Sequence, residues 1–95
     1  MRHGGKSRPC VILTRETAQV FLTKVTVAPV TSTILGIPTE VRLGPENGLD
    51  HECVVNCDNI LTLDAGQVGR RVGSLLPSQE RSLTRAIVLA FELQG

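Results

Sequence analysis

The strongest constraint on the fold is one amphipathic helical pattern at the end of the chain, behind a series of short β-rich segments. Four apolar side chains fall on one helical face, at offsets 0, 4, 7 and 8: Leu83, Ile87, Ala90 and Phe91. Ser78 suits the N-cap, and Glu80 suits the first turn, where its charge opposes the helix dipole. A lone helix of roughly four turns needs a sheet to cover, so this order predicts an α+β fold.

The segments before the helix predict a small sheet built from short strands. We expect strands at 9–14, 24–30, 39–43, 53–57, 60–63 and 70–75. Turn-forming residues occupy 44–48 and 64–69, residues 15–23 form an irregular connection, and residues 1–7 have no core pattern. The short turns favour a curled antiparallel sheet or small barrel, closed by the helix in a single domain of residues 1–95.

Composition limits what this domain can bind. Phe21 and Phe91 are the only aromatic residues, so the core must consist of Val, Leu and Ile, and an aromatic platform for nucleobase stacking is not expected. The net charge of +1 also gives no general attraction to polyanions. Basic side chains nevertheless gather before the first acidic residue, as a solvated tail or a phosphate-facing arm: Arg2, His3, Lys6, Arg8 and Arg15.

The three cysteines predict reduced thiols in a reducing cytoplasm, because an odd number does not make a disulfide framework. Cys53 and Cys57 would lie roughly 13 Å apart along a strand, too far to share an ion through bonds of about 2.3 Å. We therefore expect no metal site. Phosphate-binding glycine motifs are also missing, so we expect no cofactor. No signal peptide or apolar run of membrane-spanning length is present, and no membrane association is expected.

Residues 25–43 place hydroxyl groups where a strand ends. Thr31, Ser32 and Thr33 follow an alternating β segment, and the chain passes Gly36 and Pro38 before the next one. A rim of small polar side chains on a rigid scaffold is a common place for binding and catalytic groups. Arg8 is a second candidate, since the following proline holds its backbone extended at the start of a buried strand. Taken alone, Arg8 would be an ordinary surface arginine.

Two other kinds of catalytic group have less support. A histidine pair can cleave RNA by acid–base catalysis, but His3 lies in the N-terminal segment and His51 in a turn, so we interpret both as surface residues. The serines lack the GxSxG context of a nucleophile, and no Ser–His–Asp arrangement can be argued.

Four segments together carry a resemblance: RPCVILT at 8–14, VAPVTS at 27–32, PTEV at 38–41 and CVVNCDNI at 53–60. In sequence and spacing they resemble the MazF/PemK (Kid) family of toxin endoribonucleases, particularly its actinobacterial branch with a short N-terminus. Gly73 and Leu75 before the final helix agree as well. The resemblance extends over residues 6–93, nearly the whole chain.

The resemblance implies an SH3-like curled antiparallel β-barrel with a C-terminal helix, working as a homodimer. Such proteins cut single-stranded RNA at short sequences without a metal, in mRNA or alternatively in rRNA or tRNA. The 2′-hydroxyl attacks the adjacent phosphate and leaves a 2′,3′-cyclic phosphate and a 5′-hydroxyl. The toxin belongs to a type II toxin–antitoxin system, in which a MazE-type antitoxin holds it inactive.

The resemblance also assigns roles to residues of this chain. Arg8 and Thr31 match the catalytic residues of the family. The expected substrate-binding residues are Ser7, Ser32, Thr33, Asp58 and Asn59. Because an arginine does not readily transfer protons at neutral pH, we interpret Arg8 as the main stabiliser of charge in the transition state, with Thr31 as a second donor. Proton transfer by Arg8 stays open.

The N-terminus departs from the family pattern, and a second function is also considered. Only seven residues precede Arg8, so the family's first strand would be shortened or missing. The alternative function is that of a non-catalytic CcdB-like toxin, which inhibits a protein target such as gyrase. Such inhibition works through the C-terminal helix and needs neither Arg8 nor Thr31.

Overall fold

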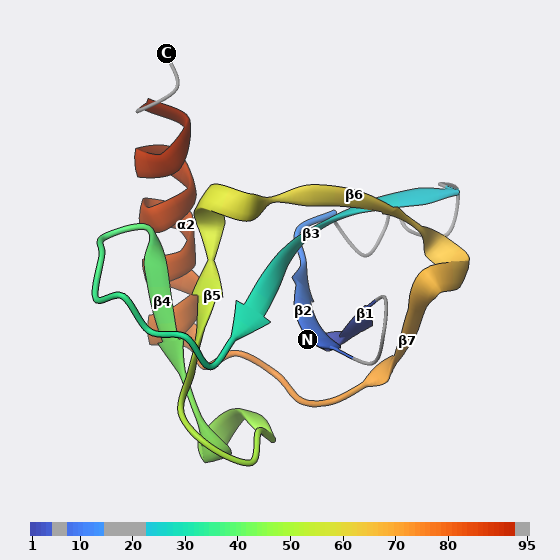
Figure 1. Ribbon diagram of the computed structural model, residues 1–95, viewed down its shortest axis with the longest axis horizontal. Helices are drawn as coiled ribbons and strands as arrows, with labels where there is room; N and C mark the ends of the chain where they lie inside the picture. The colour runs from blue at the N-terminus through green and yellow to red at the C-terminus, as the bar shows by residue number, and fades with distance from the viewer. Residues whose placement is uncertain (5–7, 15–22, 93–95) are drawn as a thin grey trace.

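The computed structural model describes residues 1–4, 8–14 and 23–92, which form a curled antiparallel sheet with one long helix packed beside it (Figure 1). The strands are β1 (Arg2–Gly4), β2 (Arg8–Ile12), β3 (Lys24–Thr31), β4 (Glu40–Leu43), β5 (Cys53–Asn56), β6 (Leu61–Asp64) and β7 (Val68–Arg71). Short 3₁₀ turns separate several of them: η1 (Pro45–Asn47), η2 (Cys57–Asn59) and η3 (Ala65–Gln67). The helix α2 spans Pro77–Glu92.

The long strand β3 organises the sheet. It pairs with β2 along one edge, while its other edge pairs first with β6 and then with β5. The strand order is β4-β5-β3-β2-β1-β7, and each pairing is antiparallel. Figure 1 shows β6 and β7 curling around the strands β1 and β2, which gives the sheet a barrel-like shape. Among the described strand pairs none joins β6 to β7, so the barrel stays open there.

The predicted α+β order is confirmed, and most predicted strands lie within two residues of the observed ones. The last strand differs more, because β7 ends at Arg71 and residues 72–76 run on without strand pairing. The residue patterns did not predict β1, although the family resemblance left open a shortened first strand, and β1 has three residues. It lies in the Gly-rich basic segment, whose sequence has no apolar alternation that would indicate a strand. Backbone pairing with β2 and β7 holds it in place. Most of the connection predicted at 15–23 falls outside the described residues.

The helix begins two residues earlier than an N-cap at Ser78 predicts. Pro77 is its first residue, a position that suits proline because the missing N–H would have no helical partner. The side chain of Gln79 accepts a hydrogen bond of 2.8 Å from the backbone N–H of Leu76, so Ser78 does not serve as the N-cap. Glu80 lies in the first turn as expected.

Small side chains join α2 to the sheet. Ala86 and Ala90 are buried in the main core with Val11, Ala28 and Val55, and the larger Leu83 and Ile87 pack at its border. Phe91 belongs to the predicted face but is 56% exposed, because it lies in the last turn, where the helix runs past β4 and β5 (Figure 1). No helix among the described residues is long and apolar enough to cross a membrane.

A close backbone crossing fixes the path from β7 to the helix. Gly73 lies against the backbone of Asn47, and Val72 donates a hydrogen bond of 2.9 Å to the carbonyl of Met1. Asn47 is 1% exposed, and its side-chain amide donates to Ser74 O at 2.8 Å and to Gln79 Oε1 at 2.6 Å. The segment before the helix is therefore tied to η1 and, through it, to the end of β4.

Candidate functional site

The register between β2 and β3 brings Arg8 and Thr31 to one edge of the sheet. Cys10 of β2 pairs with Pro29 of β3. The paired residues of β2 and β3 end there, and the same register continued by two residues brings Arg8 level with Thr31, the last residue of β3. Residues opposite each other in an antiparallel pair project to the same face. The two predicted catalytic residues therefore share one surface although 22 residues separate them in sequence.

This surface is hollowed into a cleft of about 450 Å³, within the size range of ligand-binding pockets. We call it the Arg8 cleft. Its walls come from the start of β2, the end of β3 with the residues that follow, and the residues around the start of β5. The lining residues are Arg8, Pro9, Pro29, Val30, Thr31, Ser32, Thr33, His51 and Cys53.

The three hydroxyl residues turn the chain at the mouth of this cleft. The Oγ1 atom of Thr31 accepts a hydrogen bond of 3.1 Å from the backbone N–H of Thr33. A threonine oxygen that accepts from the backbone two residues later stabilises a tight turn. It also orients the Thr31 side chain, whose own O–H can still be donated to a ligand in the cleft. Ser32 and Thr33 are exposed, as a substrate contact requires.

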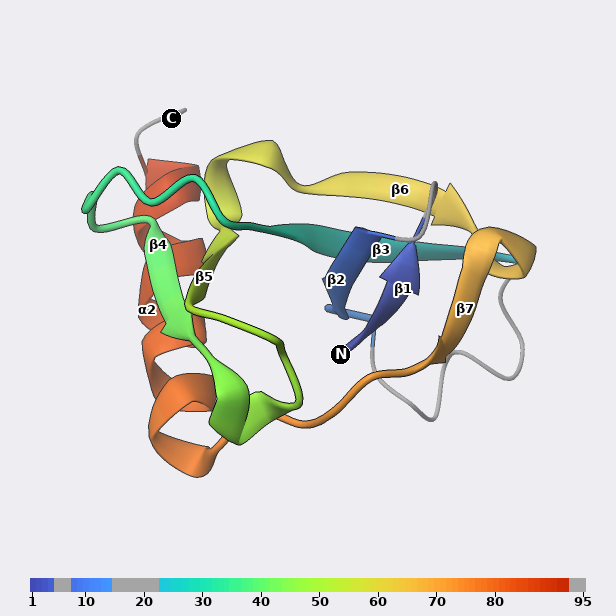
Figure 2. The same cartoon turned by 60° about the horizontal axis from the view of Figure 1, so that its bottom comes forward.

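A carboxylate shapes the loop that follows. The side chain of Glu40 accepts hydrogen bonds from the backbone N–H groups of Leu35 at 3.1 Å, Gly36 at 2.8 Å and Ile37 at 3.4 Å. Gly36 has a φ of 74°, a left-handed conformation that glycine adopts without strain. The loop projects from the edge of the sheet between β3 and β4 (Figure 1 and Figure 2). Glu40 thereby keeps this loop folded on itself.

His51 is a cleft residue that sequence reasoning did not select. It lies in the bend before β5, and β5 pairs with β3 so that Val54 stands opposite Thr31. The residues just before β5 therefore reach the same edge as the end of β3. Cys53 donates a hydrogen bond of 3.6 Å from its sulfur to the carbonyl of His51. The β-rich character of residues 53–57 beside the hydroxyl-ended strand is the one signal that could have placed His51 here.

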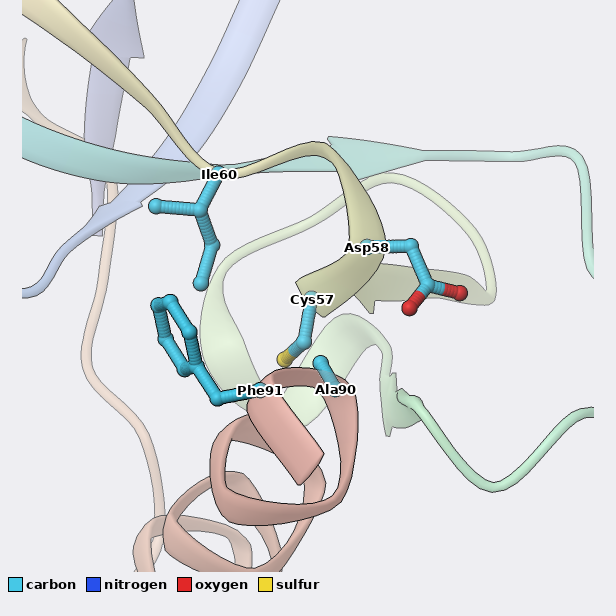
Figure 3. Close-up of a pocket in the computed structure, with 5 residues that line it drawn as sticks. All are labelled: Cys57, Asp58, Ile60, Ala90 and Phe91. Atoms are coloured by element: carbon cyan, nitrogen blue, oxygen red, sulfur yellow. The ribbon is translucent and has the colours of Figure 1, made fainter. Parts of the chain in front are cut away.

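Two other predicted substrate-binding residues, Asp58 and Asn59, do not line the Arg8 cleft. Ser7 lies outside the described residues. Asp58 and Asn59 are exposed residues of η2, and Asp58 borders a second cavity of about 260 Å³, together with Cys57, Ile60, Ala90 and Phe91. Figure 3 shows the Asp58 carboxylate pointing away from Ile60 and Phe91. This carboxylate instead accepts a hydrogen bond of 2.6 Å from the hydroxyl of Thr39, which holds η2 beside the start of β4.

The three cysteines are free and buried, in agreement with the prediction of reduced thiols. Burial raises the pKa of Cys57 to about 11, with a smaller contribution from the negative charge of Asp58. Burial also raises the pKa of Cys53, and Asp50 adds to that shift. Both thiols therefore stay neutral near pH 7. Among the described residues, no three or more His, Cys, Asp or Glu side chains gather into a possible metal site.

The cleft combines a permanent cation with hydroxyl donors. An arginine presents N–H donors in a fixed fork that matches the oxygens of a phosphate. Thr31, Ser32 and Thr33 can donate further hydrogen bonds from the end of β3 and the residues after it. This arrangement is suited to bind a phosphodiester and to stabilise negative charge that develops on it.

Comparison with known proteins agrees with this chemistry. A family model described as PemK-like, MazF-like toxin of type II toxin–antitoxin systems matches residues 2–91. Endoribonuclease MazF3 of Mycobacterium tuberculosis is 50% identical over 88 residues, which cover 93% of this chain and 85% of that protein. The solved structure of the Mycobacterium tuberculosis toxin MazF-mt6 is 47% identical with a TM-score of 0.91, covering 96% of this chain and 95% of that one.

A second similar solved structure contains an antitoxin bound to its endoribonuclease. An endoribonuclease in complex with its cognate antitoxin, from a mycobacterial species, is 29% identical to this chain with a TM-score of 0.82. The similarity covers 97% of this chain and 89% of that one. The residues that the family model matches include both Arg8 and Thr31.

Proposed function

This chain belongs to the family of PemK-like, MazF-like toxins of type II toxin–antitoxin systems, and we propose that it is an endoribonuclease whose Arg8 cleft cuts single-stranded RNA. The observation that carries the proposal is that Arg8 and Thr31 line the same cleft of about 450 Å³. The names of the curated relatives favour this function over that of the CcdB-like gyrase inhibitor considered above.

The proposed reaction is attack of the 2′-hydroxyl on the adjacent phosphate. A bond forms between the 2′-oxygen and phosphorus while the bond to the 5′-oxygen breaks, which leaves a 2′,3′-cyclic phosphate and a 5′-hydroxyl. Negative charge builds on the non-bridging oxygens in the transition state. Arg8 would stabilise that charge as a fixed cation, and the Thr31 hydroxyl would donate to the same oxygens. Arg8 thereby supplies the positive charge that a metal ion supplies in other nucleases.

The reaction needs the attacking oxygen, phosphorus and leaving oxygen in line. A single strand can rotate into that alignment, while a base-paired backbone is held in another geometry. The scarcity of aromatic residues favours recognition of bases by hydrogen bonds over stacking. Ser32 and Thr33 are exposed at the mouth of the cleft, and we propose them as substrate contacts. We also retain Ser7, Asp58 and Asn59 as substrate contacts.

We further propose that the toxin works as a homodimer in the cytoplasm and is held inactive by a MazE-type antitoxin. The antitoxin is supported by the complex of the 29% identical endoribonuclease. A dimer would add buried surface to a small domain and would bring two clefts together. The three free thiols are typical of a reducing compartment.

The decisive experiment incubates the purified chain with single-stranded RNA in the presence of EDTA and maps the ends that form. We expect cuts at a short sequence, with a 2′,3′-cyclic phosphate on one fragment and a 5′-hydroxyl on the other. A substrate with a single 2′-deoxynucleotide at the cut site should resist cleavage, because the attacking oxygen is gone. RNA that stays intact with a folded protein would refute the nuclease function.

A further inference from the structure

His51 lines the Arg8 cleft but has no role in the reaction mechanism proposed above. The side chain is exposed, belongs to the bend before β5, and lines the cleft together with Arg8 and Thr31. Pairing of Val54 with Thr31 fixes this position, since it places the start of β5 beside the end of β3. The His51 carbonyl accepts the thiol hydrogen bond of Cys53 at 3.6 Å, which ties the bend to the buried strand.

The reaction leaves one proton unassigned. The 5′-oxygen departs as an alkoxide, a strong base, unless a group protonates it as the bond to phosphorus breaks. An arginine does not give up its proton near neutral pH, and a threonine hydroxyl is a weak acid. Cys53 also lines the cleft, but burial and Asp50 raise the pKa of its thiol and make it a poor donor. Among the described residues that line the cleft, this leaves His51.

We infer that His51 is the general acid of the cleavage reaction, an inference that rests on the proposed nuclease function. The imidazolium gives its proton to the 5′-oxygen while the bond between phosphorus and that oxygen breaks. The 2′-hydroxyl loses its own proton to solvent water as its oxygen bonds to phosphorus. Histidine suits this step because its side chain both holds and releases a proton near neutral pH.

The surroundings of His51 separate the two charged parts of this mechanism. Its sequence neighbours are acidic: Asp50 and Glu52, the second of which lies 3.5 Å from Arg42 in an exposed ion pair. Arg8 contributes from a different strand, β2, and acts on the phosphate oxygens instead. One group can thus neutralise charge while the other delivers a proton.

The test uses two RNA substrates that differ in one atom. The first is the ordinary RNA, and the second carries sulfur in place of the 5′-bridging oxygen at the cut site. A thiolate leaves without protonation, so the sulfur substrate does not need a general acid. We expect His51→Gln to slow single-turnover cleavage of the ordinary RNA by about 10²- to 10⁴-fold. Cleavage of the sulfur substrate by the same variant should stay within a few-fold of the unchanged protein.

Controls separate this inference from the function on which it rests. Glu52→Gln removes a charge beside His51 without altering a residue that lines the cleft, and it should leave both rates within a few-fold. Circular dichroism and a thermal melt confirm that each variant is folded. A His51→Gln variant that cuts ordinary RNA normally, or that loses both substrates equally, overturns the assignment. Failure of the unchanged protein to cut either substrate refutes the nuclease itself, and the role of His51 falls with it.

Discussion

The carboxylate of Glu40 accepts a hydrogen bond of 2.8 Å from the backbone N–H of Gly36. The same carboxylate also accepts from Leu35 and Ile37, so one side chain fixes three successive backbone groups of the loop after the hydroxyl turn. This loop begins two residues beyond Thr33. The conformation of the loop next to the cleft-lining residues Thr31, Ser32 and Thr33 therefore depends on a residue that does not itself line the cleft.

We predict that Glu40→Gln loosens this loop. The neutral amide accepts more weakly than a carboxylate, and the loss should cost about 1 kcal/mol of unfolding free energy because the loop is exposed. Amide hydrogen exchange by NMR should speed up at Leu35, Gly36 and Ile37 and stay unchanged in the strands. Glu46→Gln, at an exposed glutamate of η1, is the control. Unchanged exchange in the Glu40 variant would mean that these hydrogen bonds do not hold the loop.

A second prediction concerns the donors of the Arg8 cleft. Arg8→Ala and Thr31→Val should each lower the single-turnover cleavage rate, by about 10²- to 10³-fold for the loss of one transition-state donor. Arg8→Lys should lie between the alanine variant and the unchanged protein, since it keeps the charge but lacks the fork.

Conservative substitutions supply the control for these variants. Thr31→Ser keeps the hydroxyl and should retain most activity. Thr31→Val has nearly the same volume as threonine, so its loss of rate would report the missing hydroxyl, both as a donor to the substrate and as the acceptor of the turn hydrogen bond from Thr33. Equal rates for the serine and valine variants would remove Thr31 from the proposed mechanism.

The sequence patterns predict where strands and helices lie better than they predict which elements pair with one another. The strands β3, β4, β5 and β6 and the helix α2 could be anticipated because each has a local apolar pattern. β1 could not, because its three residues are held by backbone pairing with β2 and β7. The segment at Cys53 also ends at Asn56, one residue early, where the Asn56 side chain accepts from Asp58 N at 2.9 Å and starts η2.

The candidate site divides in the same way. Arg8 and Thr31 could be named from a family resemblance, and the pairing of β2 with β3 places the start of one strand near the end of the other, where both residues line the cleft. His51 escaped prediction because its place in the cleft depends on the pairing of β5 with β3, which no local pattern of a turn encodes. The prediction that Phe91 lies on the buried face of the helix was wrong, because helical periodicity does not show where the sheet beneath a helix ends.

A third prediction tests the crossing between β7 and the helix. A Cβ atom at residue 73 would overlap the carbonyl oxygen of Asn47 and lie 2.7 Å from its carbonyl carbon. Both are backbone atoms that cannot move aside alone. Gly73→Ala should therefore lower the unfolding free energy by about 2–3 kcal/mol, measured by urea denaturation. Gly66→Ala, where the new methyl group meets no atom within 4 Å, should change it little. Similar stabilities for the two variants would contradict the tight crossing.

The last prediction follows from the buried thiol of Cys57. Burial and the charge of Asp58 raise its pKa from about 9 to about 11, so the folded chain keeps the proton at a pH where the unfolded chain releases it. The unfolded state then binds fewer protons, and stability falls as pH rises through this window. Below about pH 9 the contribution is fully present, and it is lost as pH rises to about 11. The expected loss is roughly 2 kcal/mol.

Comparison with Cys57→Ala isolates this effect from other groups that titrate at alkaline pH. Unfolding free energies from urea denaturation at pH 8 and pH 10.5 should differ more for the unchanged protein than for the variant. Alkylation with iodoacetamide gives a second measurement, because the thiolate is the reactive form and the neutral buried Cys57 should react slowly near pH 8. Cys57 borders the second cavity beside Phe91 but is only 2% exposed. A slow reaction would therefore reflect limited access as well as the neutral thiol. Parallel alkaline slopes for the two proteins would show that Cys57 titrates alike in the folded and unfolded chains.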